Sequence, residues 1–285
     1  MMQERHATPW WFWAMAPPLL IIIFYPTLVW LITTWLGSPY YGHGILVPLI
    51  SLVLAWRLHG HRAARATDED RPDRRLVPGV VLAAMGLGAH FLAGERHLHV
   101  VSAGALVVVL GGAVLALGGY RTLRRLAFPV AFLFLMIPLP WLEASTPYLA
   151  RGVASAAARL SAALGVDVVI LGARIELPNT ALVVGAPCSG VNSLGALVTF
   201  AVLYAFLVRG PLTSRLALMF LAVPIALLAN LVRVLLVILL AHNVGAEAAL
   251  GYFHDWSSLF LFLLAVGLLI AAGRALQCKA IRSDI

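Results

Sequence analysis

The chain has 285 residues, of which 62% are hydrophobic and only 11% are charged. Soluble globular chains carry about 25% charged and about 45–50% apolar residues, so this composition excludes a cytosolic enzyme and a disordered chain and indicates an integral membrane protein. The formal net charge of +8 comes from 20 basic residues, 19 of them arginine, which also argues against a lysine-rich DNA-binding tail.

The apolar runs predict an all-α polytopic membrane protein with about eight transmembrane helices, forming a single integral membrane domain over residues 1–285. A span needs about 20 predominantly apolar residues. The expected spans are residues 10–33, 42–57, 77–94, 100–119, 126–142, 190–208, 216–241 and 256–273. We interpret the first as a retained helix, because no small-residue cleavage site of a signal peptide follows it.

Residues 143–187 form the longest predicted external segment, between the fifth and sixth spans. Residues 143–164 mix alanine and leucine with two arginines, which is typical of an amphipathic helix at the membrane interface. Residues 166–177 are rich in β-branched side chains and precede a Pro178-Asn179 turn. The pattern predicts a small external excursion, amphipathic and then β-rich, although an ordinary surface loop is an alternative.

The arginine distribution predicts the orientation of the chain. With eight spans and a cytoplasmic N-terminus, fifteen of the 20 basic residues fall on the cytoplasmic side and four fall outside. Both termini are therefore predicted to be cytoplasmic. The remaining basic residue, Arg233, falls inside the seventh span.

Arg233 is a candidate functional residue, because an ionisable side chain inside a span carries a large free-energy cost. Asn230 precedes it by three residues and therefore shares its helical face. No Asp or Glu lies within residues 190–241. The alternative is a structural arginine that pairs with backbone carbonyls or with a carboxylate from elsewhere.

Cys188 is a candidate nucleophile. It follows Pro187 and precedes Ser189-Gly190 at the predicted start of a helix, where unpaired N–H groups favour a thiolate. A small buried apolar residue is the alternative. Cys278, in the predicted cytoplasmic tail, lacks both features, and neither cysteine has the spacing of a zinc module or a disulfide framework.

Cys188, Arg233 and His254 come from three different elements and are all predicted to lie in the outer half of the membrane. A histidine can act as base toward a thiol, and an arginine can stabilise the oxyanion that forms when a thiolate attacks a carbonyl. The set therefore fits acyl transfer through a thioester, although chance could also place three such residues on one side. His43 is a second histidine predicted at the external face.

These segments resemble the exosortase/archaeosortase family over about residues 38–262. The motifs that carry the resemblance are Val183–Leu194, Asn230–Val234, Phe253–Asp255, Tyr41–Pro48 and Pro138–Pro140. Members are multi-pass membrane cysteine enzymes of bacteria and archaea that process exported proteins with a C-terminal sorting tail. In bacteria the tail is usually of the PEP-CTERM type, with a Pro-Glu-Pro-like motif, a transmembrane helix and a basic end.

The resemblance implies a membrane-embedded cysteine protease or transpeptidase that cleaves sorting tails through a thioester on Cys188, with Arg233 and His254 completing the catalytic set. The residues it implies for substrate binding are Ser189, Gly190, Asn230 and His43. It places the chain in the inner membrane with its active site at the periplasmic face. The expected partners are exported proteins with a sorting tail and membrane lipids, not nucleic acid, and no cofactor or metal is expected.

Three positions depart from the usual family pattern and leave the subfamily and the sorting motif open. Ala186 replaces an acidic residue, Asn192 a basic residue and Ser258 a glycine. The alternative function is a non-catalytic polytopic transporter or a component of lipid or polysaccharide export. In that case Arg233 would bind an anionic group and Cys188 would only pack.

Overall fold

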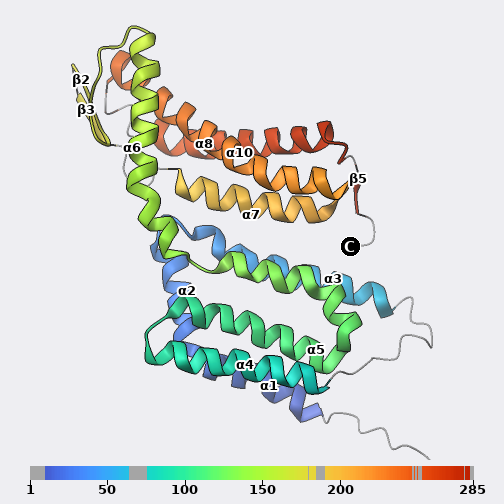
Figure 1. Ribbon diagram of the computed structural model, residues 1–285. Coiled ribbons are helices and arrows are strands. Elements are labelled where there is room, and N and C mark those ends of the chain that lie inside the picture. Colours follow the sequence, from blue (N-terminus) through green and yellow to red (C-terminus); the bar gives the residue numbers. More distant parts are fainter. Residues whose placement is uncertain are drawn as a thin grey trace, which may run out of the picture. The chain divides into compact units, whose positions relative to one another are not determined.

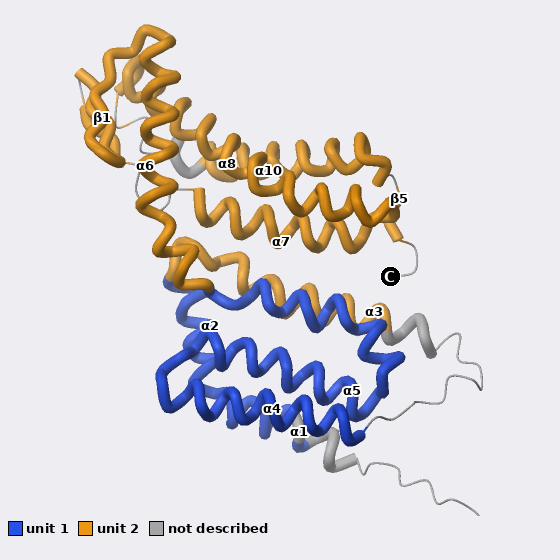
Figure 2. The backbone as a smooth tube through the Cα atoms, viewed as in Figure 1, with its two compact units in different colours: residues 1–37, 66–138 blue, residues 38–65, 139–285 orange. Residues whose placement is uncertain are grey.

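The structure is a computed structural model, and its elements are mostly helices (Figure 1). It describes residues 10–63, 76–178, 180–183, 190–245, 247, 249, 252–278 and 280–282, with the backbone alone for 10–14, 16, 59–63 and 252–255. Contacts divide the chain into two compact units (Figure 2): residues 1–37 with 66–138, and residues 38–65 with 139–285. The single domain over residues 1–285 stays a prediction.

The first unit is built from helices that pack along one another. They are α1 (Trp10–Ile23), α2 (Tyr25–Gly37), α4 (Leu76–Glu95), α5 (His99–Phe132) and the short 3-10 helix η3 (Leu133–Met136). The axes of α1 and α2 are bent by 77° at their junction. The carbonyl of Ile23 at this break lies 3.1 Å from Nε2 of His90 on α4, whose Nδ1 lies 2.7 Å from the Ser102 hydroxyl on α5. Side chains thus satisfy the backbone group that the break frees, as lipid requires.

Helix α5 contains a reversal of the chain at Gly119, whose backbone is not helical (φ 74°, ψ −179°). A Cβ atom built on Gly111 would lie 3.6 Å from Val130, and one built on Gly104 would lie 3.9 Å from Phe134. The earlier glycine thus contacts the later partner, which is the pattern of an antiparallel pair. The part of α5 after Gly119, together with η3, therefore folds back along the part before Gly119, and we call these two parts the arms of α5. The two arms correspond to the predicted spans at 100–119 and 126–142.

The second unit contains a bundle of three helices and a small sheet that packs beside α6. Its helices are η1 (Gly42–Ile45), α3 (Leu46–Ala63), α6 (Pro140–Ala163), α7 (Val191–Leu207), α8 (Leu212–Asn243) and α10 (Tyr252–Ala275). Helices α7, α8 and α10 lie side by side and alternate in direction (Figure 1). Their shared core includes Leu197, Leu218 and Leu269, which are fully buried.

The predicted β-rich excursion is confirmed as a small antiparallel sheet that follows α6. Its strands are β1 (Val169–Leu171), β2 (Arg174–Leu177) and β3 (Thr180–Val183), in the order β1-β2-β3. On one face Ile175 and Leu182, which are paired in register, join an apolar cluster with Ala157 of α6 and Val234 of α8. The helix begins at Pro140 rather than at 143, since proline is well tolerated in a first helical turn.

Aromatic side chains stabilise the irregular segment around Pro138 and Pro140, which lack N–H groups. In the first unit the Trp35 indole N–H donates to the carbonyl of Met136 at 2.9 Å. In the second unit the Tyr41 hydroxyl donates to the carbonyl of Leu139 at 2.8 Å. Each unit thus has its own aromatic anchor at this proline-rich boundary.

The prediction of about eight spans is not confirmed. Four helices in the described residues are long and apolar enough to cross a membrane, or five if the bent α1–α2 pair is one span. The four are Leu76–Glu95, His99–Met136, Leu212–Asn243 and Trp256–Ala275. The predicted spans at 42–57 and 190–208 fall on shorter apolar helices, and those at 100–119 and 126–142 fall largely on the two arms of α5 with η3, which are counted together as His99–Met136. The apolar character of these segments is therefore confirmed, and the number of them that cross the membrane stays a prediction.

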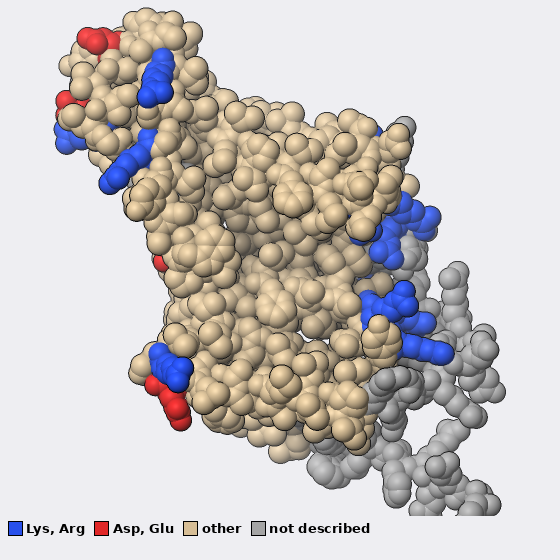
Figure 3. Space-filling view, in the orientation of Figure 1, with Lys and Arg blue, Asp and Glu red and all other residues tan. Residues whose placement is uncertain are grey.

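The chain end closes one end of the three-helix bundle. Strand β5 (Ala280–Ile281) pairs with β4 (Val208–Arg209) in the α7–α8 connection. Cys278 is buried there, and a Cβ atom built on Gly210 would lie 2.7 Å from its Sγ. The arginines at this end are Arg209, Arg215, Arg274 and Arg282, and Figure 3 shows the basic groups gathered there. All four belong to the set predicted to be cytoplasmic.

Candidate functional site

Two polar residues in the middle of α8 face the interior of the bundle. Asn230 and Arg233 are one helical turn apart and are 3% and 5% exposed. Arg233 is ten residues, or about 15 Å of helix, from the end of α8 that lies opposite the arginine-rich end. The structure therefore confirms that the two side chains share a buried face, as their spacing predicts.

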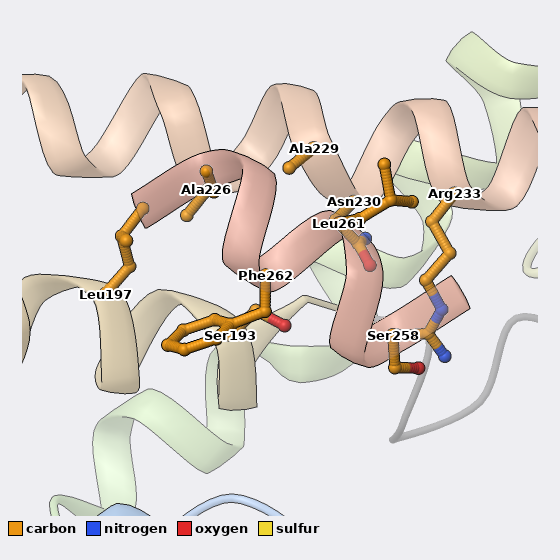
Figure 4. Close-up of a pocket in the computed structure, with 10 residues that line it drawn as sticks. Ser193, Leu197, Ala226, Ala229, Asn230, Arg233, Ser258, Leu261 and Phe262 are labelled. Carbon is orange, nitrogen blue, oxygen red and sulfur yellow. The ribbon is translucent and has the colours of Figure 1, made fainter. Parts of the chain in front are cut away.

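A small cavity lies where α7, α8 and α10 meet at this face. Its polar lining consists of Ser193, Asn230, Arg233 and Ser258, and apolar side chains of the three helices complete it. Figure 4 shows the Arg233 guanidinium group directed from α8 toward Ser258 on α10. The cavity offers about 10 Å³ to a water-sized sphere, and about 10–15 Å³ is needed to hold one water. It is therefore at the lower limit for one water molecule and has no room for a peptide.

Gly190 brings the start of α7 into contact with Asn230. It is the N-cap residue of α7 and has a left-handed backbone (φ 84°). A Cβ atom built on it would lie 2.9 Å from both Cγ and Nδ2 of Asn230. Glycine is therefore required here for two reasons, the backbone conformation and the close approach. Two of the sequence motifs, 40 residues apart, meet at this contact.

His43 lies on a different side of α7 from the cavity. A Cβ atom built on Gly195 would lie 2.7 Å from Cε1 of His43, and the cavity side of α7 is marked by Ser193, about 200° away around the helix. Its Nδ1 is buried without a hydrogen-bond partner among the described residues. His43 thus flanks the start of α7, whereas Asn230 and Arg233 approach it from α8.

Tyr41 fixes the turn that carries His43. It is 5% exposed and its hydroxyl is bonded to Leu139 at the start of α6. Burial, followed by the nearby Glu143 carboxylate, raises the pKa of Tyr41 to about 12, so the hydroxyl stays a neutral donor at physiological pH.

The remaining predicted site residues are only partly covered. Cys188 and Ser189 lie outside the described residues, and for His254 the structure describes the backbone, as the third residue of α10. Of the predicted set, the structure brings together Gly190, Asn230 and Arg233. It adds Ser193 and Ser258, which the sequence reasoning did not select as site residues. Ser258 could have been predicted as a site residue, because it lies one helical turn after His254 on the same face of the helix.

The described residues contain no group of three or more His, Cys, Asp or Glu side chains that could hold a metal ion. The chemistry available at the described site is therefore that of an amide, a guanidinium group and two hydroxyls.

Comparison with known proteins identifies one family. The sequence model of the transmembrane exosortases matches residues 30–271, most of the chain, which confirms the family resemblance of the motifs. The matched range contains every position predicted for the site. No curated protein and no solved structure matches the chain.

Proposed function

Because the chain belongs to the transmembrane exosortase family, we propose that it is a membrane-embedded cysteine protease and transpeptidase that cleaves C-terminal sorting tails of exported proteins. The family consists of membrane-embedded sorting transpeptidases that act on exported proteins with sorting signals. The proposal adds the residues and the reaction: Cys188 as nucleophile, with Arg233 and His254 as its catalytic partners.

The contact between Gly190 and Asn230 is the observation that carries the proposal. It joins the segment that follows Cys188 to the face of α8 on which Arg233 lies buried. Cys188 precedes Gly190 by two residues, and two residues of chain span at most about 7 Å. This covalent limit supports a nucleophile close to the buried guanidinium group.

In the proposed reaction the Cys188 thiolate attacks the carbonyl carbon of the scissile peptide bond. Arg233 stabilises the negative charge on the carbonyl oxygen, and an arginine in a site shielded from water is well suited to this because it stays protonated. His254 donates a proton to the departing amine, so that the tail leaves with its transmembrane helix. A thioester then links Cys188 to the exported protein.

The second half of the reaction resolves the thioester. Water or another nucleophile attacks the thioester carbonyl, His254 accepts its proton, and the Cys188 sulfur departs as a thiolate. The backbone register supports the role of His254, since it lies one turn before Ser258, which lines the same cavity as Arg233.

The proposed location is the inner membrane, with the active site at the periplasmic face. Gly190 and the Arg233 half of α8 lie at the end of the bundle opposite Arg209, Arg215, Arg274 and Arg282. Since arginines concentrate on the cytoplasmic side, this arrangement supports a site facing outward. The proposed substrates carry tails of the PEP-CTERM type, and their transmembrane helices reach the bundle through the surrounding lipid.

Co-expression with a tagged exported protein that bears a sorting tail tests the proposal, with the processed fraction measured by mass. Cys188→Ala should abolish processing, whereas Cys278→Ala, at the opposite end of the bundle, should leave it unchanged. Arg233→Ala should lower the rate by about 100- to 1,000-fold. Arg233→Lys should remain impaired because it lacks the planar fork. Processing by Cys188→Ala would show that the nucleophile is another group.

A further inference from the structure

Strand β3 forms one edge of the external sheet and leads directly into the proposed catalytic segment. Among the described residues no strand pairs with its outer side, since the sheet order is β1-β2-β3. Its last residue, Val183, is 66% exposed and precedes Cys188 by five residues. An edge strand presents unpaired N–H and C=O groups that can pair with another extended chain.

The register identifies which backbone groups face this edge. A two-residue turn closes with a hydrogen bond between its flanking residues, here Leu177 and Thr180. Hydrogen-bonded and non-hydrogen-bonded pairs alternate along an antiparallel ladder. Thr180 and Leu182 therefore direct their backbone groups toward β2, whereas Ala181 and Val183 direct theirs outward.

The sheet packs beside α6 and shares an apolar cluster with the helix that carries the buried arginine. Leu182 of β3 is 5% exposed and belongs to one apolar cluster with Val234 and Ile238 of α8. Val234 directly follows Arg233 in the sequence. One face of β3 thus packs in the cluster that includes α8, and β3 ends five residues before Cys188.

We propose that the outer edge of β3 binds the exported substrate, by pairing with an extended segment of its sorting signal next to the scissile bond. The inference rests on the proposed function, because it names the surface that presents the peptide to Cys188. Main-chain pairing supplies affinity for an extended peptide, and the side chains on either face supply selectivity.

The opposite edge of the same sheet provides a matched comparison. In β1 the same alternation makes Ile170 the residue whose backbone groups face outward, because Leu171 and Arg174 flank the two-residue β1–β2 turn. β1 is also apolar and exposed, with Val169 at 54% and Leu171 at 57%. It lies farther along the chain from Cys188, so the proposal assigns the substrate to β3 and not to β1.

A proline scan of the two edges tests the inference in the intact membrane protein. Ala181→Pro removes the outward N–H of β3, and an edge strand tolerates proline at such a position. It should lower the processing rate about tenfold at low substrate concentration. Ile170→Pro, which removes the outward N–H of the other edge, should process normally. Equal effects of Ala181→Pro and Ile170→Pro would overturn the inference.

Photocrosslinking provides a readout that does not depend on cleavage. A benzophenone side chain at position 183 should crosslink to the sorting signal of a co-expressed substrate in the Cys188→Ala background, whereas one at position 171 should not. Normal, Cys188-dependent processing without a crosslink at position 183 would refute substrate binding at the β3 edge. It would leave the proposed function intact. A crosslink to a second copy of this chain instead of to the substrate would also overturn it. A substrate crosslink at 183 in a chain that still processes without Cys188 would support the edge and refute the cysteine mechanism.

Discussion

Replacing Gly190 with alanine tests whether the start of α7 and Asn230 form a functional contact. The left-handed backbone at Gly190 costs an alanine about 1–2 kcal/mol. The added Cβ would lie 2.9 Å from the Asn230 amide, well inside an ordinary separation of about 3.5–4.0 Å between carbon atoms. Relieving such an overlap costs about 1–3 kcal/mol. We therefore expect Gly190→Ala to destabilise the protein by about 2–5 kcal/mol.

Gly165 offers a matched control, because it has nearly the same backbone (φ 87°) but nothing within 4 Å of an added Cβ. Gly165→Ala should cost only the backbone contribution, about 1–2 kcal/mol, and should leave processing of a sorting tail unchanged. Gly190→Ala should lower processing by about tenfold to a hundredfold, because it displaces a group beside the buried guanidinium. Unfolding in mixed detergent micelles and the co-expression assay measure the two effects.

A double-substitution cycle separates the contact from the backbone conformation. If the Asn230 amide is the obstacle, Gly190→Ala should cost less stability when Asn230→Ala is also present, and the two free energies should not add. Additive free energies, or equal behaviour of Gly190→Ala and Gly165→Ala in both assays, would refute the reasoning.

Two further predictions concern other close approaches of glycine. Gly79→Ala should destabilise the first unit, since the added Cβ would overlap the backbone of Ala116. Gly88→Ala on the same helix meets nothing and should be neutral or stabilising, and the unfolding free energies of the two variants compare them. Gly195→Ala should displace the His43 ring, so its cost in unfolding free energy should shrink in a His43→Ala background, and an unchanged cost would contradict the contact.

Local patterns predicted the elements that depend on nearby residues. The strands after residue 166 and their turn at Pro178 were predictable from β-branched residues and a turn signal, and the structure places them within a few residues. The shared face of Asn230 and Arg233 follows from helical spacing alone. Both depend on interactions over three or four residues, which the sequence displays directly.

Contacts between residues that are far apart in the sequence could not be predicted in the same way. Nothing within the sequence near Gly190 indicates that Asn230 will lie against it, because that contact depends on how α7 packs on α8. Ser193 and Ser258 share a cavity for the same reason. Apolar composition alone does not reveal where a helix ends, and α7 ends after 17 residues, so the number of spans is not fixed by the sequence pattern.

The pairing of β5 with β4 has a practical consequence for labelling this protein. Since β5 is held at the arginine-rich end, Arg282 follows it there, and the Arg282 guanidinium lies 5.0 Å from the ring centre of Phe206 at the end of α7. A fluorophore attached at Arg282 is thus joined to the bundle at the end opposite Gly190, where it can report on expression and insertion without obstructing the site.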